Sequence, residues 1–231
     1  MIEMRNVVRK YKDGDKDIVA LNEVDLKLDD NEFLVILGPS GSGKSTLINV
    51  MSALDRCDLG QVLYDDTNIC KYNEKKLTKF RRENIGFIFQ AYYLLPDLNV
   101  ENNIRMGANL VENNDYQDII EILDLKDMLK RMPYQLSGGQ QQRVAIARAL
   151  AKKPRVLFCD EPTGALDEKT GKQVLTLLQN YQKKHNITIV MVTHNSGIAD
   201  MATRVIRMNS GNIIEDKKNE NVIAAVNVRW A

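Results

Sequence analysis

The sequence lacks several features that would assign its class directly. Its longest apolar runs, Phe33 to Leu37 and Ile187 to Val192, are far shorter than the about 20 residues that cross a bilayer. The stretch from Met1 to Arg5 does not have the charged-then-apolar layout of a signal peptide. The formal net charge is only +1, so nucleic acid is not expected as a partner.

Cysteine and histidine are also scarce. The three cysteines, Cys57, Cys70 and Cys159, show no paired spacing, and two histidines, His185 and His194, are too few for a typical zinc site. These features predict a reducing, cytosolic setting. If the protein moves a compound across a membrane, another chain must supply the channel.

Short apolar segments alternate with helical patterns along the chain. Continuous apolar runs, typical of strands buried on both faces, occur at 33–37, 85–89, 156–159, 187–192 and 205–208. Residues 1–11 and 24–28 alternate apolar and polar side chains and predict two earlier, half-exposed strands. The alternation of strands and helices predicts an α/β fold with a mostly parallel sheet.

The middle of the chain is predicted to be helical, with no strand of its own. We therefore expect a helical subdomain at 90–152, inserted into an α/β core formed by 1–89 and 153–231, all within a single domain. The last residues, 216–231, are polar and then weakly apolar, and their pattern assigns them to no element.

A glycine-rich loop follows the run at 33–37 and precedes a helical pattern. It reads Gly38-Pro39-Ser40-Gly41-Ser42-Gly43-Lys44-Ser45-Thr46 and fits the phosphate-binding pattern G-x-x-x-x-G-K-[ST]. The glycines allow successive backbone N–H groups to turn inward and hold phosphate oxygens, while Lys44 adds positive charge and Ser45 offers a hydroxyl to Mg²⁺. The loop predicts a bound nucleoside triphosphate. A simple Gly/Ser-rich connection would not require lysine and serine at these places.

Two carboxylates, Asp160 and Glu161, follow the apolar run at 156–159. Ligands of α/β sheets bind at this end of a strand. Asp160 is a candidate to hold Mg²⁺ through water, and Glu161 is a candidate general base that polarises the attacking water. The alternative is an ordinary acidic turn after a strand. The presence of the phosphate loop in the same chain argues against it.

A second glycine motif, Leu136-Ser137-Gly138-Gly139-Gln140, precedes a predicted helix. Ser137 is a suitable N-cap, and the two glycines leave the N–H groups of the helix start open to an anion. Local physics alone would favour the simpler interpretation of this segment as a capped helix.

In combination, these motifs resemble the nucleotide-binding subunits of ATP-binding-cassette (ABC) transporters. Residues 136–140 are identical to the L-S-G-G-Q signature of that family, and the resemblance covers about 1–215. It implies an ATPase built on a P-loop NTPase core of the RecA type. It also implies an N-terminal antiparallel β subdomain and an inserted helical subdomain.

The resemblance assigns roles to four further residues. Tyr11 matches the aromatic residue that stacks on adenine, and Gln90 matches the glutamine that links Mg²⁺ and the attacking water to the membrane subunit. Asp167 matches a loop that crosses the dimer interface, and His194 matches the histidine that contacts the terminal phosphate. Taken singly, Tyr11 would be an ordinary strand aromatic and His194 a structural histidine.

These inferences define the expected site. The residues expected to hold ATP are Tyr11, Gly38, Pro39, Ser40, Gly41, Ser42, Gly43, Lys44, Ser45, Thr46, Ser137, Gly138, Gly139, Gln140 and Asp167. The residues expected at the metal are Ser45, Gln90 and Asp160, and those expected to act in hydrolysis are Glu161, His194 and Gln90.

The resemblance also implies partners. Two copies would form a homodimer when ATP is bound, with each nucleotide between the loop 38–46 of one copy and Ser137–Gln140 of the other. An integral membrane permease would hold the dimer on the inner face of the cell membrane, and an extracytoplasmic adaptor or substrate-binding protein is a further candidate partner. The permease is expected to dock around 90–98, with Tyr92, Tyr93 and Leu94 as apolar contacts, unless these side chains pack inside the helical subdomain.

Residues 49–55, 89–96 and 161–167 resemble one branch of the family, which comprises macrolide exporters, lipoprotein-release systems and peptide-antibiotic-resistance systems. The expected work is export or sensing of drugs or antimicrobial peptides, or lipoprotein extraction. The alternative is ATP-driven regulation of cell-wall hydrolysis or division through a membrane partner. Leu59-Gly60 and the hairpin at 64–67 depart from the usual pattern, but both lie away from the chemistry.

Overall fold

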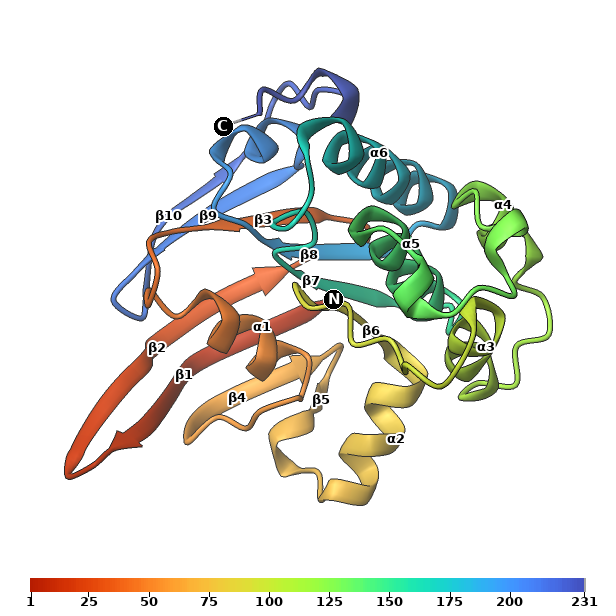
Figure 1. Cartoon of the computed structure of the whole chain (residues 1–231). Coiled ribbons are helices and arrows are strands. Elements are labelled where there is room, and N and C mark those ends of the chain that lie inside the picture. Colours follow the sequence, from red (N-terminus) through yellow and green to blue (C-terminus); the bar gives the residue numbers. More distant parts are fainter. Residues whose placement is uncertain (231) are drawn as a thin grey trace.

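The computed structural model describes residues 1–230 and contains two β-sheets (Figure 1). The larger sheet has six strands in the order β10-β9-β3-β8-β7-β6. Its strands are β3 (Phe33–Leu37), β6 (Ile85–Ile88), β7 (Val156–Asp160), β8 (Thr188–Val192), β9 (Arg204–Asn209) and β10 (Asn212–Lys218). All neighbouring pairs are parallel except β9 and β10. The predicted α/β fold with a mostly parallel sheet is confirmed.

The smaller sheet is antiparallel and forms the predicted N-terminal β subdomain. Its strands, in the order β2-β1-β4-β5, are β1 (Ile2–Asp13), β2 (Lys16–Leu28), β4 (Leu59–Tyr64) and β5 (Thr67–Asn68). The predicted half-exposed strands at 1–11 and 24–28 are therefore parts of one long hairpin.

Helices cover both faces of the larger sheet. They are α1 (Lys44–Met51), α2 (Glu74–Asn84), α3 (Val100–Asn109), α4 (Gln117–Ile122), α5 (Gly138–Leu150) and α6 (Glu168–His185). Short 3-10 helices are η1 (Ile69–Lys71), η2 (Lys126–Met128), η3 (Pro133–Gln135), η4 (Ser196–Met201) and η5 (Ala225–Asn227). Figure 1 shows α1 between the two sheets, and α5 and α6 on the opposite side of the larger sheet.

The strand β3 shows why its sequence is apolar throughout. Phe33, Val35 and Leu37 join the core cluster that contains α3, α5 and α6. Leu34 and Ile36 point the other way, into the cluster with α1 and the smaller sheet. Because successive side chains of a strand face opposite sides, a strand covered on both sides needs apolar residues at every position.

The helical stretch predicted for 90–152 contains α3, α4 and α5 and no strand. It lies between β6 and β7 in the chain. Because α5 also packs against β6, the division into a core and a helical subdomain at these boundaries stays a prediction. Ala231, the last residue of the predicted domain, lies outside the described residues.

The segment 216–231, which the sequence pattern left unassigned, has a clear place as far as residue 230. Strand β10 continues to Lys218, and the following residues cross α6. The Gln179 side chain of α6 holds this tail: its amide donates to the carbonyl of Ile223 at 3.0 Å, and its Oε1 accepts from the backbone N–H of Ala225 at 3.0 Å.

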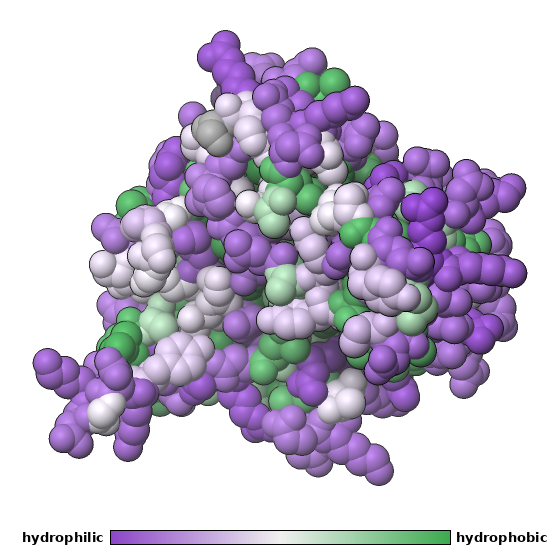
Figure 2. Space-filling model, viewed as in Figure 1, coloured by the Kyte–Doolittle hydropathy of each residue, from purple (hydrophilic) through white to green (hydrophobic). Residues whose placement is uncertain are grey.

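Hydrophilic residues cover most of the face in Figure 2, and apolar residues appear there as small, scattered areas. Within residues 1–230, none of the helices combines the length and the apolar character that crossing a bilayer requires.

Candidate nucleotide site

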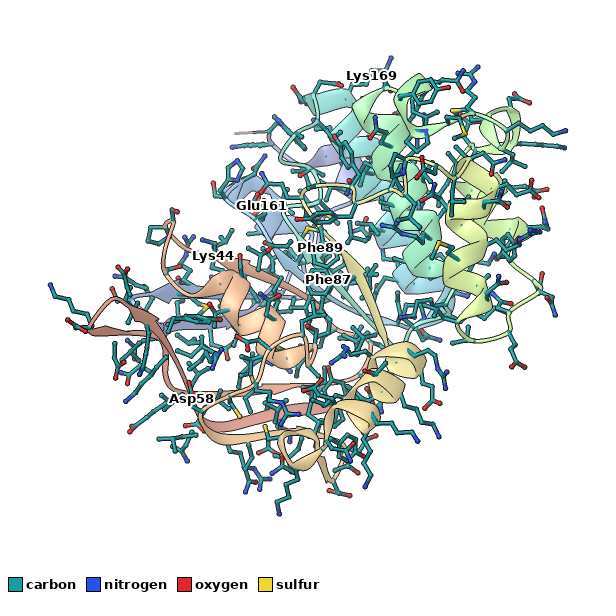
Figure 3. The ribbon with its side chains drawn as sticks, turned by 60° about the horizontal axis from the view of Figure 1, so that its bottom comes forward. Lys44, Asp58, Phe87, Phe89, Glu161 and Lys169 are labelled. Carbon is teal, nitrogen blue, oxygen red and sulfur yellow. The ribbon has the colours of Figure 1, made fainter. Side chains whose placement is uncertain are left out.

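A cavity of about 780 Å³ collects residues from both sheets and from α1. Of the predicted site residues, the following line it: Tyr11, Gly38, Ser40, Gly41, Ser42, Gly43, Lys44, Ser45, Thr46, Gln90, Asp160, Glu161 and His194. Figure 3 shows Lys44 on α1 and Glu161 just beyond β7. The carboxyl ends of β3, β7 and β8 meet at this edge of the parallel sheet, which is where ligands of such sheets bind.

The phosphate loop adopts a backbone that requires glycine at two positions. Gly38 has φ 153° and Gly43 has φ 100°, both in the region that favours glycine. A Cβ at Gly38 would collide with the carbonyl oxygen of Met208, and one at Gly43 would collide with that of Ala20. The loop is therefore wedged between β9 and β2.

Positive charge and free donors converge inside this loop. The Lys44 ammonium donates to the carbonyls of Gly38 at 2.9 Å and Pro39 at 2.8 Å, which keep it at the mouth of the loop. No side chain caps the start of α1, so its first N–H groups remain open to an anion. The buried Ser42 hydroxyl has no hydrogen-bond partner. These groups fit the phosphates of a nucleotide.

Asp160 and Ser45 form the oxygen-rich side of the cavity. The Ser45 hydroxyl donates to Asp160 Oδ1 at 3.3 Å. Burial raises the pKa of Asp160, although the Ser45 hydrogen bond and the Lys44 charge oppose the rise. A carboxylate and a hydroxyl, with the exposed Gln90 amide in the same cavity, are oxygen donors of the kind that Mg²⁺ accepts.

Glu161 is held in an uncommon conformation. Its φ is 51°, a left-handed value that costs energy for a residue with a side chain, and its N–H donates to the carbonyl of Val192 at 3.0 Å. His194 Nδ1 lies 2.7 Å from Glu161 Oε2, yet Oε2 is among the buried polar atoms without a hydrogen-bond partner, so the two groups approach without a well-formed hydrogen bond. The Glu161 carboxylate keeps acceptor capacity for a molecule in the cavity.

Tyr11 stands on the rim of the cavity, 38% exposed. Its hydroxyl donates to Asp55 Oδ2 at 2.7 Å, and the Arg9 guanidinium lies 4.6 Å from its ring centre. One ring face is therefore covered by Arg9. Sequence reasoning missed both Arg9 and Asp55. Nothing in the pattern links Asp55 to Arg9, 46 positions away. Arg9 lies two positions before Tyr11 on the same strand, β1, and this spacing was a signal that could have found it.

The signature residues lie outside this cavity. The Ser137 hydroxyl caps α5 by accepting from the Gln140 N–H at 3.3 Å, and Gln140 Oε1 accepts from the Ser137 N–H at 2.9 Å. A Cβ at Gly138 would meet the Tyr92 hydroxyl, and one at Gly139 would collide with Thr170. The two glycines thus also permit close packing, a role that sequence reasoning did not assign to them.

Asp167 is likewise outside the cavity, where it caps α6. Its carboxylate accepts from the backbone N–H of Thr170 at 3.0 Å and from the Thr170 hydroxyl at 2.7 Å. These bonds lower the pKa of Asp167. Since Thr170 also contacts the signature glycine Gly139, Asp167 and the signature share one neighbour.

A protein-family model described as "ABC transporter" matches residues 21–164, more than half of the chain. The chain belongs to the ABC transporter family. This ABC cassette carries the nucleotide-binding fold of the family, and the prediction of an ATP-binding ATPase domain is confirmed.

Similar proteins agree with this assignment. The ABC transporter ATP-binding protein MG065 homolog of Mycoplasma pneumoniae is 42% identical over 234 residues, which are 100% of this chain and 50% of that protein. The macrolide export ATP-binding/permease protein MacB of Psychrobacter arcticus is 40% identical over 227 residues, covering 96% of this chain and 34% of MacB. The cassette thus spans about half the length, or less, of these two relatives.

Among solved structures, the ATP-binding cassette MJ0796 of Methanocaldococcus jannaschii, a dimer in a post-hydrolysis state with ADP and Pi, superposes with a TM-score of 0.88. It is 37% identical, and the match covers 94% of this chain and 98% of that one. The predicted P-loop NTPase core is confirmed, and MacB falls in the branch that the sequence resembles.

Proposed function

We propose that this cassette hydrolyses ATP to drive a separate membrane permease. The observation that carries the proposal is the single cavity in which the phosphate loop, Asp160, Glu161 and His194 converge. A phosphate cradle alone fits any nucleotide-binding protein. The acidic pair beside it supplies the groups that hydrolysis needs.

In this proposal the loop N–H groups and Lys44 hold the phosphates, and the free ring face of Tyr11 stacks on adenine. Ser45, Asp160 and Gln90 would hold Mg²⁺, whose charge would offset that of the phosphate oxygens. Glu161 orients the attacking water and accepts its proton. His194 lies beside Glu161 and donates to the terminal phosphate.

The site is proposed to be completed by a second copy of the chain. Ser137 is exposed and does not line the cavity of its own chain, so another molecule is needed to bring a signature to the nucleotide. The dimeric MJ0796 structure supports this arrangement. Gly138, Gly139, Gln140 and Asp167 belong to the same proposed interface.

Mixing two inactive variants tests the shared site. Lys44→Ala disables the loop, and Ser137→Asp keeps a good N-cap while placing negative charge where phosphates are expected. In a mixed dimer one site retains both intact halves, so activity should recover to about a quarter of the wild-type value after random pairing. If the mixture stays inactive while each variant still folds, the shared site is wrong.

The permease is proposed to dock around 90–98. Tyr93 is 65% exposed and packs edge-on against Phe89, with ring centres 5.2 Å apart, while Phe89 stacks on Phe87 at 4.2 Å (Figure 3). Tyr92 and Leu94 are half-buried, and Leu94 packs on the core. Of the three apolar contacts that the sequence suggests, Tyr93 is the one most available to a partner.

The proposed work is export or sensing of drugs or antimicrobial peptides, or extraction of lipoproteins, with the cassette in the cytoplasm on the inner face of the membrane. The similarity to MacB, a macrolide export ATP-binding/permease protein, supports the first of these. Purification of the tagged cassette together with the proteins bound to it tests the proposal. The same experiment tests whether an extracytoplasmic adaptor or substrate-binding protein belongs to the complex. A copurified permease supports transport, whereas a partner that binds a cell-wall hydrolase would redirect the function to wall remodelling.

A further inference from the structure

Two cysteines that are separated in the sequence meet at the edge of the smaller sheet. Cys57 lies in the loop after α1, Cys70 lies in η1, and their Sγ atoms are 2.9 Å apart. Both thiols are free and half-buried, whereas Cys159 is fully buried in β7. We propose that Cys57 and Cys70 form a reversible intramolecular disulfide, a modification site separate from the ATP chemistry.

The geometry requires little movement. A disulfide bond is about 2.0 Å long, so the two sulfur atoms must approach by less than about 1 Å. Cys57 has no helix or strand hydrogen bonds to break, because it lies in the irregular segment between α1 and β4. Asp58, the next residue, lies at the edge of the molecule in Figure 3. The pair is therefore near solvent and near bonding distance.

The surroundings make the two thiols chemically unequal. The hydrogen bond from Cys57 lowers the pKa of Cys70. Backbone N–H groups of Val62 and Cys70 and the charge of Arg56 act in the same direction, and burial opposes them. The same contact with Cys70, followed by burial, raises the pKa of Cys57. Cys70 is thus the thiolate that reacts first, and Cys57 is the thiol that resolves the product.

The co-reactant is a hydroperoxide, ROOH. The Cys70 thiolate attacks the terminal oxygen, the O–O bond breaks, and the departing alkoxide takes a proton and leaves as ROH, giving a sulfenic acid on Cys70. The Cys57 sulfur then attacks the Cys70 sulfur, the S–O bond breaks, and the hydroxyl leaves as water with the Cys57 proton. Two thiols are oxidised, one hydroperoxide is reduced, and an external dithiol reverses the change.

The bond would act on the adenine side of the cavity. Asp55, two residues before Cys57, accepts from the Tyr11 hydroxyl at 2.7 Å. A Cys57–Cys70 bond fastens this segment to η1 and β4. In a reducing compartment such a disulfide forms only transiently, when oxidant is present. Two thiols that lie close together but are not bonded fit this behaviour.

The test uses the reduced full-length protein treated with hydrogen peroxide, then blocked with an alkylating reagent and mapped by mass spectrometry without reduction. We expect one linked peptide pair joining Cys57 and Cys70, a mass loss of two hydrogen atoms, and full reversal by dithiothreitol. Cys159→Ser should form the same bond, whereas Cys57→Ser and Cys70→Ser should not. The oxidised protein should show a Tm higher by about 5–10 °C, because a short loop is closed.

The proposal is overturned if Cys70 is oxidised to sulfinic acid without any linked peptide, or if the link forms only between separate chains. It is also overturned if the bonded protein has a lower Tm, since the bond would then have trapped a distorted chain. The wild-type mass measurement decides the matter even if a serine variant fails to fold.

Discussion

His194 Nδ1 lies 2.7 Å from Glu161 Oε2, although 33 residues separate them in the chain. The pairing of Asp160 with Val192 in the parallel register of β7 and β8 explains this closeness, because each of the two residues leaves the same edge of the sheet just after its strand. His194 and Glu161 therefore lie together in the cavity that the phosphate loop also lines. This arrangement motivates the first prediction.

Glu161→Gln should retain ATP binding and lose turnover. The amide keeps the size of the side chain but cannot accept a proton, so kcat should fall by about 10²- to 10⁴-fold. Phosphate release and nucleotide binding are measured separately. Glu121→Gln, on the exposed surface of α4, is the matched control and should behave as wild type. Wild-type turnover in Glu161→Gln would remove Glu161 from the base role.

Lys44→Ala should weaken nucleotide binding and turnover together. The lost charge-assisted contacts are worth about 10- to 100-fold in affinity. Binding of a fluorescent ATP analogue and the ATPase rate report the two effects. Lys75→Ala, an exposed lysine of α2, should change neither quantity. An unchanged affinity in Lys44→Ala would contradict the phosphate-site assignment.

Asp160→Asn should stabilise the protein at neutral pH while abolishing Mg²⁺-dependent hydrolysis. Burial raises the pKa of Asp160 above its ordinary value of 3.8. As pH rises past 3.8, the unfolded chain ionises first, so the folded state loses stability until its own pKa is passed. The Tm advantage of the variant should therefore be present at pH 7 and vanish below 3.8. Asp97→Asn, at an exposed position, is the control, and an equal gain at both pH values would exclude the titration of Asp160 as the cause.

Tyr93→Ala should uncouple the cassette from its permease while leaving basal ATPase activity in place. The side chain is exposed and contacts Phe89, so its loss removes partner surface and little core. Copurification of the permease and substrate-stimulated ATPase activity are the measurements. Tyr134→Ala, an exposed tyrosine in η3, is the control. Full assembly and full stimulation in Tyr93→Ala would contradict docking at this surface.

Gly171→Ala should have opposite effects with and without Trp230. In the wild-type chain a Cβ at Gly171 collides with the Trp230 ring, so the free energy of unfolding should fall by about 1–2 kcal/mol. In a Trp230→Ala background the same change only improves a helix interior and should add about 0.5–1 kcal/mol. Urea unfolding of the wild type, the two single variants and the double variant measures the coupling free energy between the two positions. Additive effects would show that the Trp230 ring does not pack on Gly171.

The sequence alone determined the strands at 33–37, 85–89 and 156–159, the phosphate loop and the acidic pair. Each is encoded by neighbouring residues, because burial on both faces demands a continuous apolar run, and a phosphate cradle demands glycines next to lysine and serine. The ordered motifs also identified the family. Cys159 is buried as its apolar neighbours predicted.

Only the tertiary structure brought together residues without any local signal. The contacts of Asp55 with Tyr11 and Arg9, of Cys57 with Cys70, and of the tail with α6 depend on how separate segments pack. A hydrophobic pattern specifies that a face is buried but not what covers it, so such contacts are fixed when the elements assemble. Ser137 lies outside the cavity of its own chain for the same reason. Its position depends on how α5 packs, and the residues next to it in the sequence do not determine that.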